Sequence, residues 1–308
     1  MKMDFGAYAF FEGNFVPIED AKVSIMTHTF NYGTGVFEGI RGYWNGNESQ
    51  LYIFKLQKHY QRMFKNFNLF RIRLPLSIEE TCRITVELAR MNEFRQDMYI
   101  RPIAYKSSYE LGPRIDDLKD EFTVFNIKLG DYLDTARGLS VMVSSWRRVP
   151  DNCIPARSKA TGIYINSALA STEAKENGFD EAIMLAQDGF VSEGSAMNLF
   201  MVRDGELITT PVTSDILEGV TRDTIIQLAR EQMGIETVIR PIGRTELYLA
   251  DELFFCGTGA QVAPVTAVDR RAIGNGNPGE LTLKLQALYF DMVQNRLPEY
   301  SHWLTPVY

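Results

Sequence analysis

The chain has little of what several common classes of site require. Its three cysteines, Cys82, Cys153 and Cys256, form no CxxC pair, so neither a disulfide framework nor a cysteine-based zinc site is indicated. Three histidines argue against a zinc or histidine-base centre. The formal net charge of −7 argues against a nucleic-acid partner, because phosphate neutralisation needs clustered lysine and arginine.

Long hydrophobic runs are also missing. No apolar stretch approaches the roughly 18–20 residues of a membrane helix. Asp4 and Glu12 interrupt the N-terminal region, where a signal peptide needs an apolar core. We therefore expect a cytoplasmic protein with no membrane partner. Its 308 residues exceed what one hydrophobic core usually supports, which predicts two domains.

Hairpin-like strand pairs with a few interspersed helices predict an α+β fold rather than a doubly wound α/β fold. We predict a small N-terminal domain over 1–129, an interdomain linker over 130–138 and a larger C-terminal domain over 139–308. The linker is inferred from the polar, glycine-bounded sequence GDYLDTARG.

In the first half of the chain we expect a hairpin with Gly13-Asn14 at its turn, one strand over 35–44 and a helix over 56–70. Ser77 and Glu80 have capping-box spacing and predict the start of a second helix. Further strands are expected over 98–105, 122–129, 139–146 and 252–259.

In the second half we expect a helix over 163–177 and hairpin turns at 188–189 and 204–205. A further helix should begin with Thr221 as its N-cap, and a closing helix should cover 280–296.

The sequence GNGNPG (274–279) matches the G-x-G-x-x-G pattern of dinucleotide-binding folds. That fingerprint also needs a closing strand and an acidic residue about 20 positions on. Only one helix and a tail follow Gly279. We interpret the segment as a turn before the last helix, and a nicotinamide oxidoreductase as the alternative that rests on it.

Lys159, in PARSKATGIYINSALA (155–170), stands among small residues just before a helix. The positive end of a helix dipole disfavours an extra proton on an amine. A neutral amine is what imine chemistry with a carbonyl cofactor requires. Tyr164 follows in the first helical turn, close along the chain. The alternatives are a surface lysine and a core aromatic.

Glu193 is a single carboxylate between apolar strand segments in GFVSEGSAMNLF. It is either a hairpin residue in water or the group that keeps a pyridine nitrogen protonated. Two segments predict anion sites: LEGVTRDT (217–224), with backbone N–H groups at a helix start, and the turn CGTGA (256–260). Arg62, on a predicted helix, would add a charged clamp or lie in solvent.

The succession of Lys159, Tyr164, Glu193 with Asn198, LEGVTRD and CGTGAQVAPV resembles fold-type IV pyridoxal-phosphate enzymes over essentially the whole chain. FNYGTGVFEGIRGY (30–43), YIRP (99–102) and LYLADELFFCGTG (247–259) are similar to branched-chain amino acid aminotransferases in particular. The resemblance implies a two-domain architecture of the D-amino-acid-aminotransferase type with pyridoxal 5'-phosphate as cofactor. It also implies a homodimer or higher homo-oligomer with sites near the interface.

The resemblance further implies roles for individual residues. Lys159 would hold the cofactor covalently and act catalytically, with Glu193 at the pyridine nitrogen and Tyr164 near the phenolic oxygen. The other cofactor-binding residues implied are Arg62, Asn198, Leu217, Gly219, Val220, Thr221, Gly257 and Thr258. The substrate-binding residues implied are Tyr32, Phe37, Gly39, Tyr99, Arg101, Tyr132, Gly259 and Ala260. No metal is expected.

Four positions depart from the pattern of relatives, one of which is Gly259 in place of a common alanine, although its amide is retained. Thr161 and Ile163 differ near Lys159, and Leu129 stands where several relatives have tryptophan. The predicted function is transfer of the amino group of leucine, isoleucine or valine to 2-oxoglutarate. The alternative on the same fold is a lyase of the aminodeoxychorismate lyase type.

Overall fold

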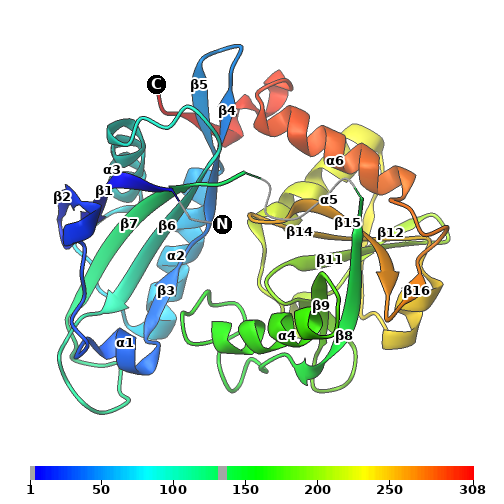
Figure 1. Cartoon of the computed structure of the whole chain (residues 1–308), viewed down its shortest axis with the longest axis horizontal. Coiled ribbons are helices and arrows are strands. Elements are labelled where there is room, and N and C mark those ends of the chain that lie inside the picture. Colours follow the sequence, from blue (N-terminus) through cyan, green and yellow to red (C-terminus); the bar gives the residue numbers. More distant parts are fainter. Residues whose placement is uncertain (1–3, 131–136) are drawn as a thin grey trace. The chain divides into compact units, whose positions relative to one another are not determined.

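The computed structural model describes residues 4–130 and 137–308 (Figure 1). Most of the predicted linker, together with Tyr132, lies outside the described residues. Contacts along the chain divide it into two compact units. Unit 1 comprises Met1–Gly130, Ser158–Gly162 and Asp291–Tyr308, and unit 2 comprises Asp131–Arg157 and Ile163–Phe290.

This division differs from the predicted domains in two segments. Ser158–Gly162 and Asp291–Tyr308 fall within the predicted C-terminal domain but belong to unit 1. The first segment is hydrogen-bonded to a unit 1 strand, since the Thr161 amide donates to the Gly35 carbonyl at 2.8 Å. The second contributes β17 (Leu304–Pro306), which pairs with β5 (Gln50–Phe54). Both segments therefore belong to unit 1 because they are hydrogen-bonded to strands that lie far from them in the sequence.

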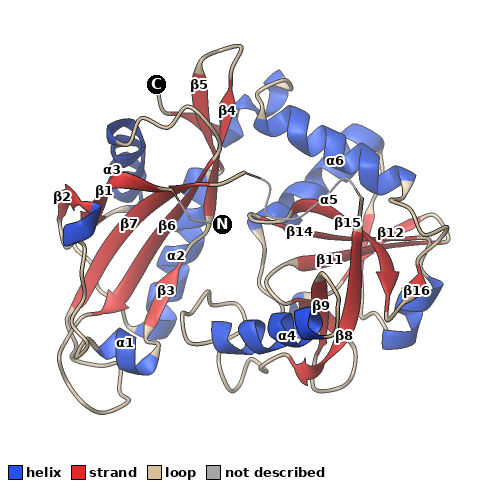
Figure 2. Ribbon diagram, in the orientation of Figure 1, coloured by secondary structure: helices blue, strands red, loops and turns tan. Residues whose placement is uncertain are grey.

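Unit 1 contains an antiparallel sheet, described as eight strands in the order β17-β5-β4-β6-β7-β1-β2, with β3 paired to β6 (Figure 2). Its other strands are β1 (Phe5–Phe11), β2 (Asn14–Pro17), β3 (Gly35–Phe37), β4 (Ile40–Asn45), β6 (Met98–Lys106) and β7 (Asp120–Lys128). Its helices are α1 (His28–Tyr32), α2 (Leu56–Phe70) and α3 (Ile78–Met91), with the short 3-10 helices η1 (Ile18–Asp20) and η4 (Pro298–Trp303).

The core of unit 1 lies between this sheet and the helices α2 and α3. In α2, the buried residues Leu56, Tyr60, Met63 and Phe67 recur at helical spacing and form one apolar stripe. They pack with buried side chains of the strands, such as Ile100. Polar residues are also buried on this helix, and His59 is one of them.

Unit 2 contains a second, mixed sheet in the order β10-β9-β8-β15-β14-β11-β12-β13, with β16 paired to β15. Its strands are β8 (Leu139–Arg147), β9 (Glu181–Leu185), β10 (Val191–Gly194), β11 (Asn198–Arg203), β12 (Glu206–Thr209), β13 (Thr237–Ile239), β14 (Glu252–Gly257), β15 (Gln261–Val268) and β16 (Arg271–Ala272). Three pairs are parallel: β8 with β9, β8 with β15, and β12 with β13.

The helices that follow in the chain are α4 (Tyr164–Glu176), α5 (Val220–Met233) and α6 (Glu280–Val293), with the 3-10 helices η2 (Val212–Ser214) and η3 (Arg244–Leu249). The last three residues of α6 are counted with unit 1. The core of unit 2 is built from strand residues such as Val141, Ile183, Leu199, Phe255 and Val265. Two strand-rich sheets with separate helices make the fold α+β, as predicted.

Several local predictions are confirmed. The helix over 56–70 is α2. The Ser77 side chain accepts the Glu80 amide while Glu80 accepts the Ser77 amide, which is the predicted capping box. The turns at 188–189 and 204–205 join β9 to β10 and β11 to β12. The segment 274–279 is a turn before α6, with positive φ at Gly274 and Gly276.

Other local predictions are wrong. The first hairpin turns at Glu12-Gly13, both with positive φ, and Asn14 already pairs with Phe11. The segment 35–44 is two strands rather than one, because it breaks at Glu38-Gly39.

Two helix boundaries also differ. The N-cap of α5 is Gly219, not Thr221, since Gly219 is extended and its carbonyl accepts the Asp223 amide. The closing helix ends at Val293 rather than at 296.

Candidate active site

The loop that carries Lys159 is held against β3 in unit 1. The Phe37 amide donates to the Lys159 carbonyl at 3.0 Å, and Val36 and Ala160 form an antiparallel bridge. The Thr161 hydroxyl donates to the Gly33 carbonyl at 2.8 Å. The departure at Thr161 therefore adds a side-chain hydrogen bond that fixes this loop. Ile163, the second departure, is buried.

Phe37 brings the predicted catalytic lysine and a predicted substrate arginine to one aromatic ring. The Lys159 Nζ lies 5.0 Å from the ring centroid, and the Arg101 guanidinium carbon lies 4.3 Å from it. Cations at these distances are attracted by the face of the ring. Three predicted site residues thus meet within unit 1.

Tyr99 positions Arg101. The Arg101 Nη2 donates to the Tyr99 hydroxyl at 2.7 Å, and the guanidinium carbon lies 5.1 Å from the Tyr99 ring. This matches strand alternation, which places both side chains on one face of β6. Gly39 is part of the same arrangement, because a Cβ there would collide with the Tyr99 hydroxyl. Any larger residue at this position would displace the Tyr99 ring from its present place.

Arg62 is ion-paired with a buried carboxylate that sequence analysis did not single out. Its Nε donates to Glu38 Oε1 at 2.8 Å and its Nη2 donates to Glu38 Oε2 at 2.7 Å. The His59 Nδ1 contacts Glu38 Oε2 at 2.8 Å. Glu38 is fully buried and His59 nearly so. The signal for Glu38 was a lone carboxylate in the apolar run GVFEGI.

These contacts fix the charges of the three groups. Burial alone would raise the pKa of Glu38, but Arg62 and His59 outweigh it and hold that pKa far below its usual range. Burial lowers the pKa of His59, and the charges of Arg62 and Lys159 lower it further against the effect of Glu38. His59 is therefore a neutral donor to an ionised Glu38 at neutral pH.

Unit 2 gathers a second group of predicted residues around Glu193. The Asn198 Nδ2 donates to Glu193 Oε2 at 2.8 Å and to the Leu217 carbonyl at 2.9 Å. The Leu217 amide donates to Glu193 Oε2 at 3.2 Å. On the other oxygen, the Arg148 Nη2 contacts Glu193 Oε1 at 2.9 Å. Glu193 is buried, so it is not a hairpin residue in water.

The two predicted anion segments lie next to this group. A Cβ at Gly219 would collide with the Asn198 side chain, which places the start of α5 beside Asn198. Val220 and Thr221 form the first turn of α5, where backbone N–H groups have no partner within the helix.

The turn that joins β14 to β15 contains Gly257, Thr258, Gly259 and Ala260. Asn198 pairs with Cys256, the residue just before this turn. The sheet register therefore brings this turn toward the same end of unit 2 as Asn198.

The predicted site residues Tyr164 and Tyr32 lie outside the two groups of contacts around Phe37 and Glu193 that are described above. Tyr164 is the first residue of α4 and is half-buried. Tyr32, at the end of α1, accepts the Gly112 amide at 3.0 Å and packs on the His28 ring at 4.6 Å. Arg148 was missed entirely, because nothing in RRVP distinguishes it from the exposed Arg147.

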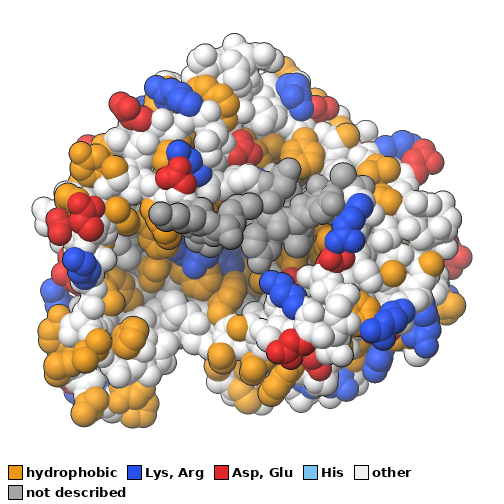
Figure 3. Space-filling view, in the orientation of Figure 1, with side chains coloured by type: hydrophobic (Ala, Val, Ile, Leu, Met, Phe, Trp, Pro, Cys, Tyr) orange, Lys and Arg blue, Asp and Glu red, His pale blue; other side chains and the backbone are white. Residues whose placement is uncertain are grey.

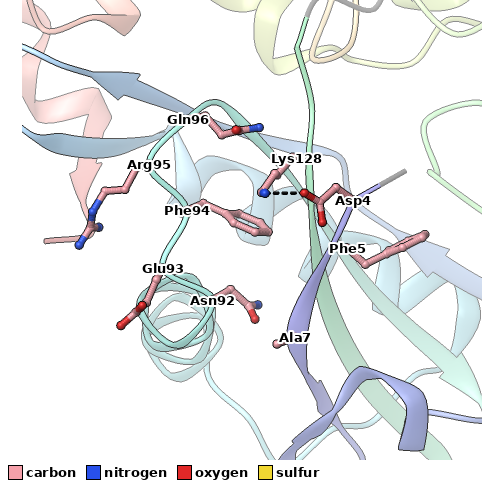
Figure 4. A pocket seen from close by; sticks show the side chains of 9 residues that line it. All are labelled: Asp4, Phe5, Ala7, Asn92, Glu93, Phe94, Arg95, Gln96 and Lys128. Carbon is pink, nitrogen blue, oxygen red and sulfur yellow. Dashed lines mark ion pairs between the residues drawn. The ribbon is translucent and has the colours of Figure 1, made fainter. Parts of the chain in front are cut away.

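One polar hollow in unit 1 holds none of the predicted site residues. Its volume is about 380 Å³, and an Asp4–Lys128 ion pair lies at its wall (Figure 4). The lining residues are Asp4, Phe5, Ala7, Asn92, Glu93, Phe94, Arg95, Gln96 and Lys128. Within residues 4–130 and 137–308, no group of three His, Cys, Asp or Glu side chains could hold a metal ion. In the same ranges, no helix is long and apolar enough to cross a membrane.

Known proteins match this chain over nearly its whole length. The family model of class IV amino-transferases matches residues 35–268. A probable branched-chain-amino-acid aminotransferase of Aquifex aeolicus is 49% identical over 301 residues, which cover 98% of this chain and 97% of that protein.

Two solved structures are similar as well. The branched-chain amino acid aminotransferase of Thermobaculum terrenum in its PLP form has a TM-score of 0.94 and 40% identity, covering 99% of each chain. The branched-chain aminotransferase of the thermophilic archaeon Thermoproteus uzoniensis, in a structure with norvaline, has a TM-score of 0.94 and 41% identity, covering 98% of this chain and 100% of that one. The chain therefore belongs to the class IV aminotransferase family and has its fold.

Proposed function

We propose that this protein is a pyridoxal 5'-phosphate-dependent transaminase that moves the amino group of leucine, isoleucine or valine to 2-oxoglutarate. The products are the branched 2-oxo acid and L-glutamate. The observation that carries the proposal is the Phe37 ring in unit 1, which contacts both the Lys159 amine and the Arg101 guanidinium. The amine that would react with the cofactor and the guanidinium that would bind a substrate carboxylate thus contact the same aromatic ring.

The donor groups present fit this cofactor. Lys159 supplies an amine for its aldehyde, and the buried Glu193 supplies a carboxylate for a protonated ring nitrogen. The first turn of α5 supplies backbone N–H groups suited to a phosphate. In unit 1, the guanidinium of Arg62 is fixed by Glu38 and would add a cation for the same anion.

When bound, the cofactor supplies an electron-withdrawing ring that acidifies the hydrogen on the substrate Cα. Lys159 would take that proton with its amine once the substrate has replaced it on the cofactor, and would return it at the cofactor C4′. Glu193 would keep the ring nitrogen protonated, and Tyr164 would donate to the phenolic oxygen. The phosphate would be held by Arg62, Gly219, Val220, Thr221, Gly257 and Thr258, with Asn198 and Leu217 supporting Glu193.

Arg101 would allow one pocket to bind two substrates with different side chains. One pocket must accept the apolar side chain of leucine and then the side-chain carboxylate of glutamate. Tyr99 and Phe37 hold the guanidinium against aromatic surface, which stabilises the cation when no carboxylate is present. Gly39, Tyr32 and Tyr132 would line the substrate site, and the amides of Gly259 and Ala260 would meet the α-carboxylate.

A half-reaction spectrum tests the proposal. Leucine, isoleucine or valine added alone should convert the bound cofactor to its amino form, and 2-oxoglutarate should restore the original spectrum. The alternative, a lyase of the aminodeoxychorismate lyase type, predicts release of product without this exchange. Failure of all three amino acids to change the spectrum would contradict the proposed function.

The proposed homodimer or higher oligomer is supported by an apolar surface of unit 1. The segments 25–32 and 108–112 are joined by hydrogen bonds, such as His28 Nε2 to the Gly112 carbonyl at 2.9 Å. They expose large apolar side chains: Ile25 (78% exposed), Met26, Phe30 (68%), Tyr109 and Leu111 (90%). Figure 3 shows apolar side chains gathered over this part of unit 1 at the lower left. An apolar surface of this kind fits a second copy of the chain.

Light scattering tests the oligomer. Phe30→Glu combined with Ile25→Glu should yield smaller particles, because two charges would be buried in an apolar interface. Leu283→Glu, at another exposed apolar position on α6, is the matched control and should leave the mass unchanged. The same oligomer in all three proteins would exclude this surface.

We also propose a cytoplasmic location. The three cysteines are free thiols, which suits a reducing compartment. Cell fractionation checks this, with the protein expected in the soluble cytoplasmic fraction.

A further inference from the structure

A short loop of unit 1, residues 108–112, is attached to the helix α1 at both of its ends. At the first end, the His28 amide donates to the Ser108 carbonyl at 2.9 Å. At the second end, the Gly112 amide donates to the Tyr32 hydroxyl at 3.0 Å, and the His28 Nε2 lies 2.9 Å from the Gly112 carbonyl. Two side chains of α1 therefore bind the two backbone polar groups of one residue.

The imidazole of His28 is buried, and its other nitrogen is held by the sheet. The His28 Nδ1 lies 2.7 Å from the Thr34 hydroxyl. The Thr34 carbonyl accepts the Lys106 amide of β6 at 3.3 Å and the Thr29 hydroxyl at 3.0 Å. A carbonyl only accepts, so this pattern assigns a hydrogen to Nε2, and in the neutral ring the Thr34 hydroxyl donates to Nδ1. The ring therefore links Gly112 to the sheet of unit 1.

The contact with Gly112 determines what the Tyr32 hydroxyl can do. The hydroxyl accepts the Gly112 amide, so its own hydrogen is left for a different acceptor. Accepting one hydrogen bond also makes a hydroxyl a better donor in a second one. Tyr32 is 37% exposed, so its side chain is accessible to a ligand.

The packing of the loop does not by itself fix Gly112. Tyr109 and Leu111 are 62% and 90% exposed, so their side chains do not anchor the loop in the core. The φ of Gly112 is +126°, a conformation in which a side chain would be strained. Glycine also loses more conformational freedom on folding than other residues, so its peptide groups need fixed partners to stay in place. His28 supplies such a partner.

We propose that His28 is a positioning residue that acts through Gly112 to hold the Tyr32 hydroxyl in place for the amino acid substrate. The inference rests on the proposed function, in which Tyr32 lines the substrate site. Loss of the hydrogen bond from His28 frees the Gly112 amide, and with it the Tyr32 hydroxyl. KM for leucine should therefore rise, whereas kcat should change little, because the groups that carry out the chemistry are untouched.

Two substitutions of His28 separate its hydrogen bond to Gly112 from the packing of its ring. The amide nitrogen of His28→Gln lies near the place of Nε2 and can still donate to Gly112, whereas His28→Asn is too short to reach it. Both variants lose the ring contact with Tyr32, which is 4.6 Å between centroids.

We expect KM for leucine to rise about 3- to 10-fold in His28→Asn, the value of one hydrogen bond, and less than about 2-fold in His28→Gln. Values of kcat should stay within about 2-fold of the wild type in both. His302→Asn, at an exposed histidine, is the matched control and should change neither constant.

A double variant tests whether His28 acts through Tyr32. Tyr32→Phe alone should also raise KM for leucine. Adding His28→Asn to it should have little further effect, because the hydroxyl that His28 positions is already gone. Equal KM changes in His28→Asn and His28→Gln, an unchanged KM in Tyr32→Phe, or additive effects in the double variant would overturn the inference.

Gly112→Ala provides an arm that leaves His28 in place. Strain at the positive φ should displace the Gly112 amide and raise KM for leucine by a similar factor. If His28→Asn does not fold, Gly112→Ala decides: a raised KM supports the inference, and the KM of the wild type refutes it. A wild type that does not exchange its amino group with leucine would instead contradict the proposed function.

Discussion

Glu38 in unit 1 and Glu193 in unit 2 are both buried carboxylates, but the chain satisfies them in different ways. Glu38 receives a two-armed contact from Arg62 and a third from the neutral His59. Glu193 is contacted by Arg148 and also by the neutral groups of Asn198 and Leu217. Glu38 orients the guanidinium of Arg62, whereas Glu193 is itself oriented by the groups that contact it. On the proposed function, Glu38 would act through Arg62, and Glu193 would act on the cofactor itself.

Lys159→Ala should have the largest effect of the variants. It removes the amine that is proposed to hold the cofactor and to transfer the proton. Activity should fall by at least about 10³-fold, because neither the covalent hold on the cofactor nor the proton transfer has a substitute. Fold and phosphate binding should persist, since the loop is held by backbone bonds and Thr161. Steady-state rates and circular dichroism measure the two properties. Appreciable residual turnover would refute the assignment.

Glu38→Gln should have the next largest effect, on stability rather than on chemistry. Removing one partner of a buried ion pair costs about 3–5 kcal/mol, because Arg62 keeps its charge but loses the carboxylate that it contacts with two nitrogens. Urea unfolding at neutral pH measures this loss. A free energy of unfolding within about 1 kcal/mol of the wild type, on the order of experimental scatter, would show that Glu38 contributes little.

The pH dependence sharpens this prediction. The pKa of Glu38 is far below its ordinary value of 4.5 in the folded protein, and that of His59 is also lowered. Both groups therefore take up protons more readily when unfolded, so their contribution is present at neutral pH and is lost as the pH falls. The wild type should lose stability steeply below about pH 4.5, and Glu38→Gln should lose less over that range. Parallel curves for the two proteins would contradict this.

Glu193→Gln should reduce turnover on the order of 10²-fold while cofactor binding changes less. The amide keeps the shape of the side chain and its contact with Asn198 but cannot stabilise a protonated ring nitrogen. Stopped-flow absorbance gives turnover, and titration of the cofactor-free protein gives affinity. Glu193→Asp is the matched control that keeps the charge. Near-normal turnover of the glutamine variant would leave Glu193 without a direct role.

Arg101→Ala should have the smallest effect, and only on one substrate. A hydrogen bond to a charged group is worth roughly 1.5–3 kcal/mol, so KM for glutamate and 2-oxoglutarate should rise about 10- to 100-fold. The leucine half-reaction should change much less. The two half-reactions are measured separately by absorbance of the cofactor. Equal losses for leucine and glutamate would mean that Arg101 supports the fold or the α-carboxylate.

Sequence patterns were most informative where the signal is local. The capping box of Ser77 and Glu80 and the aspartate-glycine turns each depend on a few adjacent residues, and all were predicted. The break at Glu38-Gly39 was missed because the apolar residues around it continue without interruption. The start of α5 was placed at Thr221 because a hydroxyl is the common cap. The cap is Gly219 instead, whose missing side chain leaves room for the adjacent Asn198 side chain.

Contacts between distant segments could not be predicted from such patterns. The parallel pairing of β8 with β9 and β15 depends on sheet order, which no local motif specifies. Arg147 and Arg148 are identical neighbours, yet one is exposed and the other pairs with Glu193. Lys159, Phe37 and Arg101 were identified by resemblance, but their meeting on one ring required the pairing of β3 with both β6 and the lysine loop.

Reductive trapping tests the central claim, that Lys159 is the amine that holds the cofactor. The loaded wild-type protein is treated with borohydride, digested and mapped by mass spectrometry. The account predicts one modified peptide, which contains Lys159 and carries the mass of a reduced pyridoxyl phosphate group. Modification of a different lysine, or of none, would contradict it.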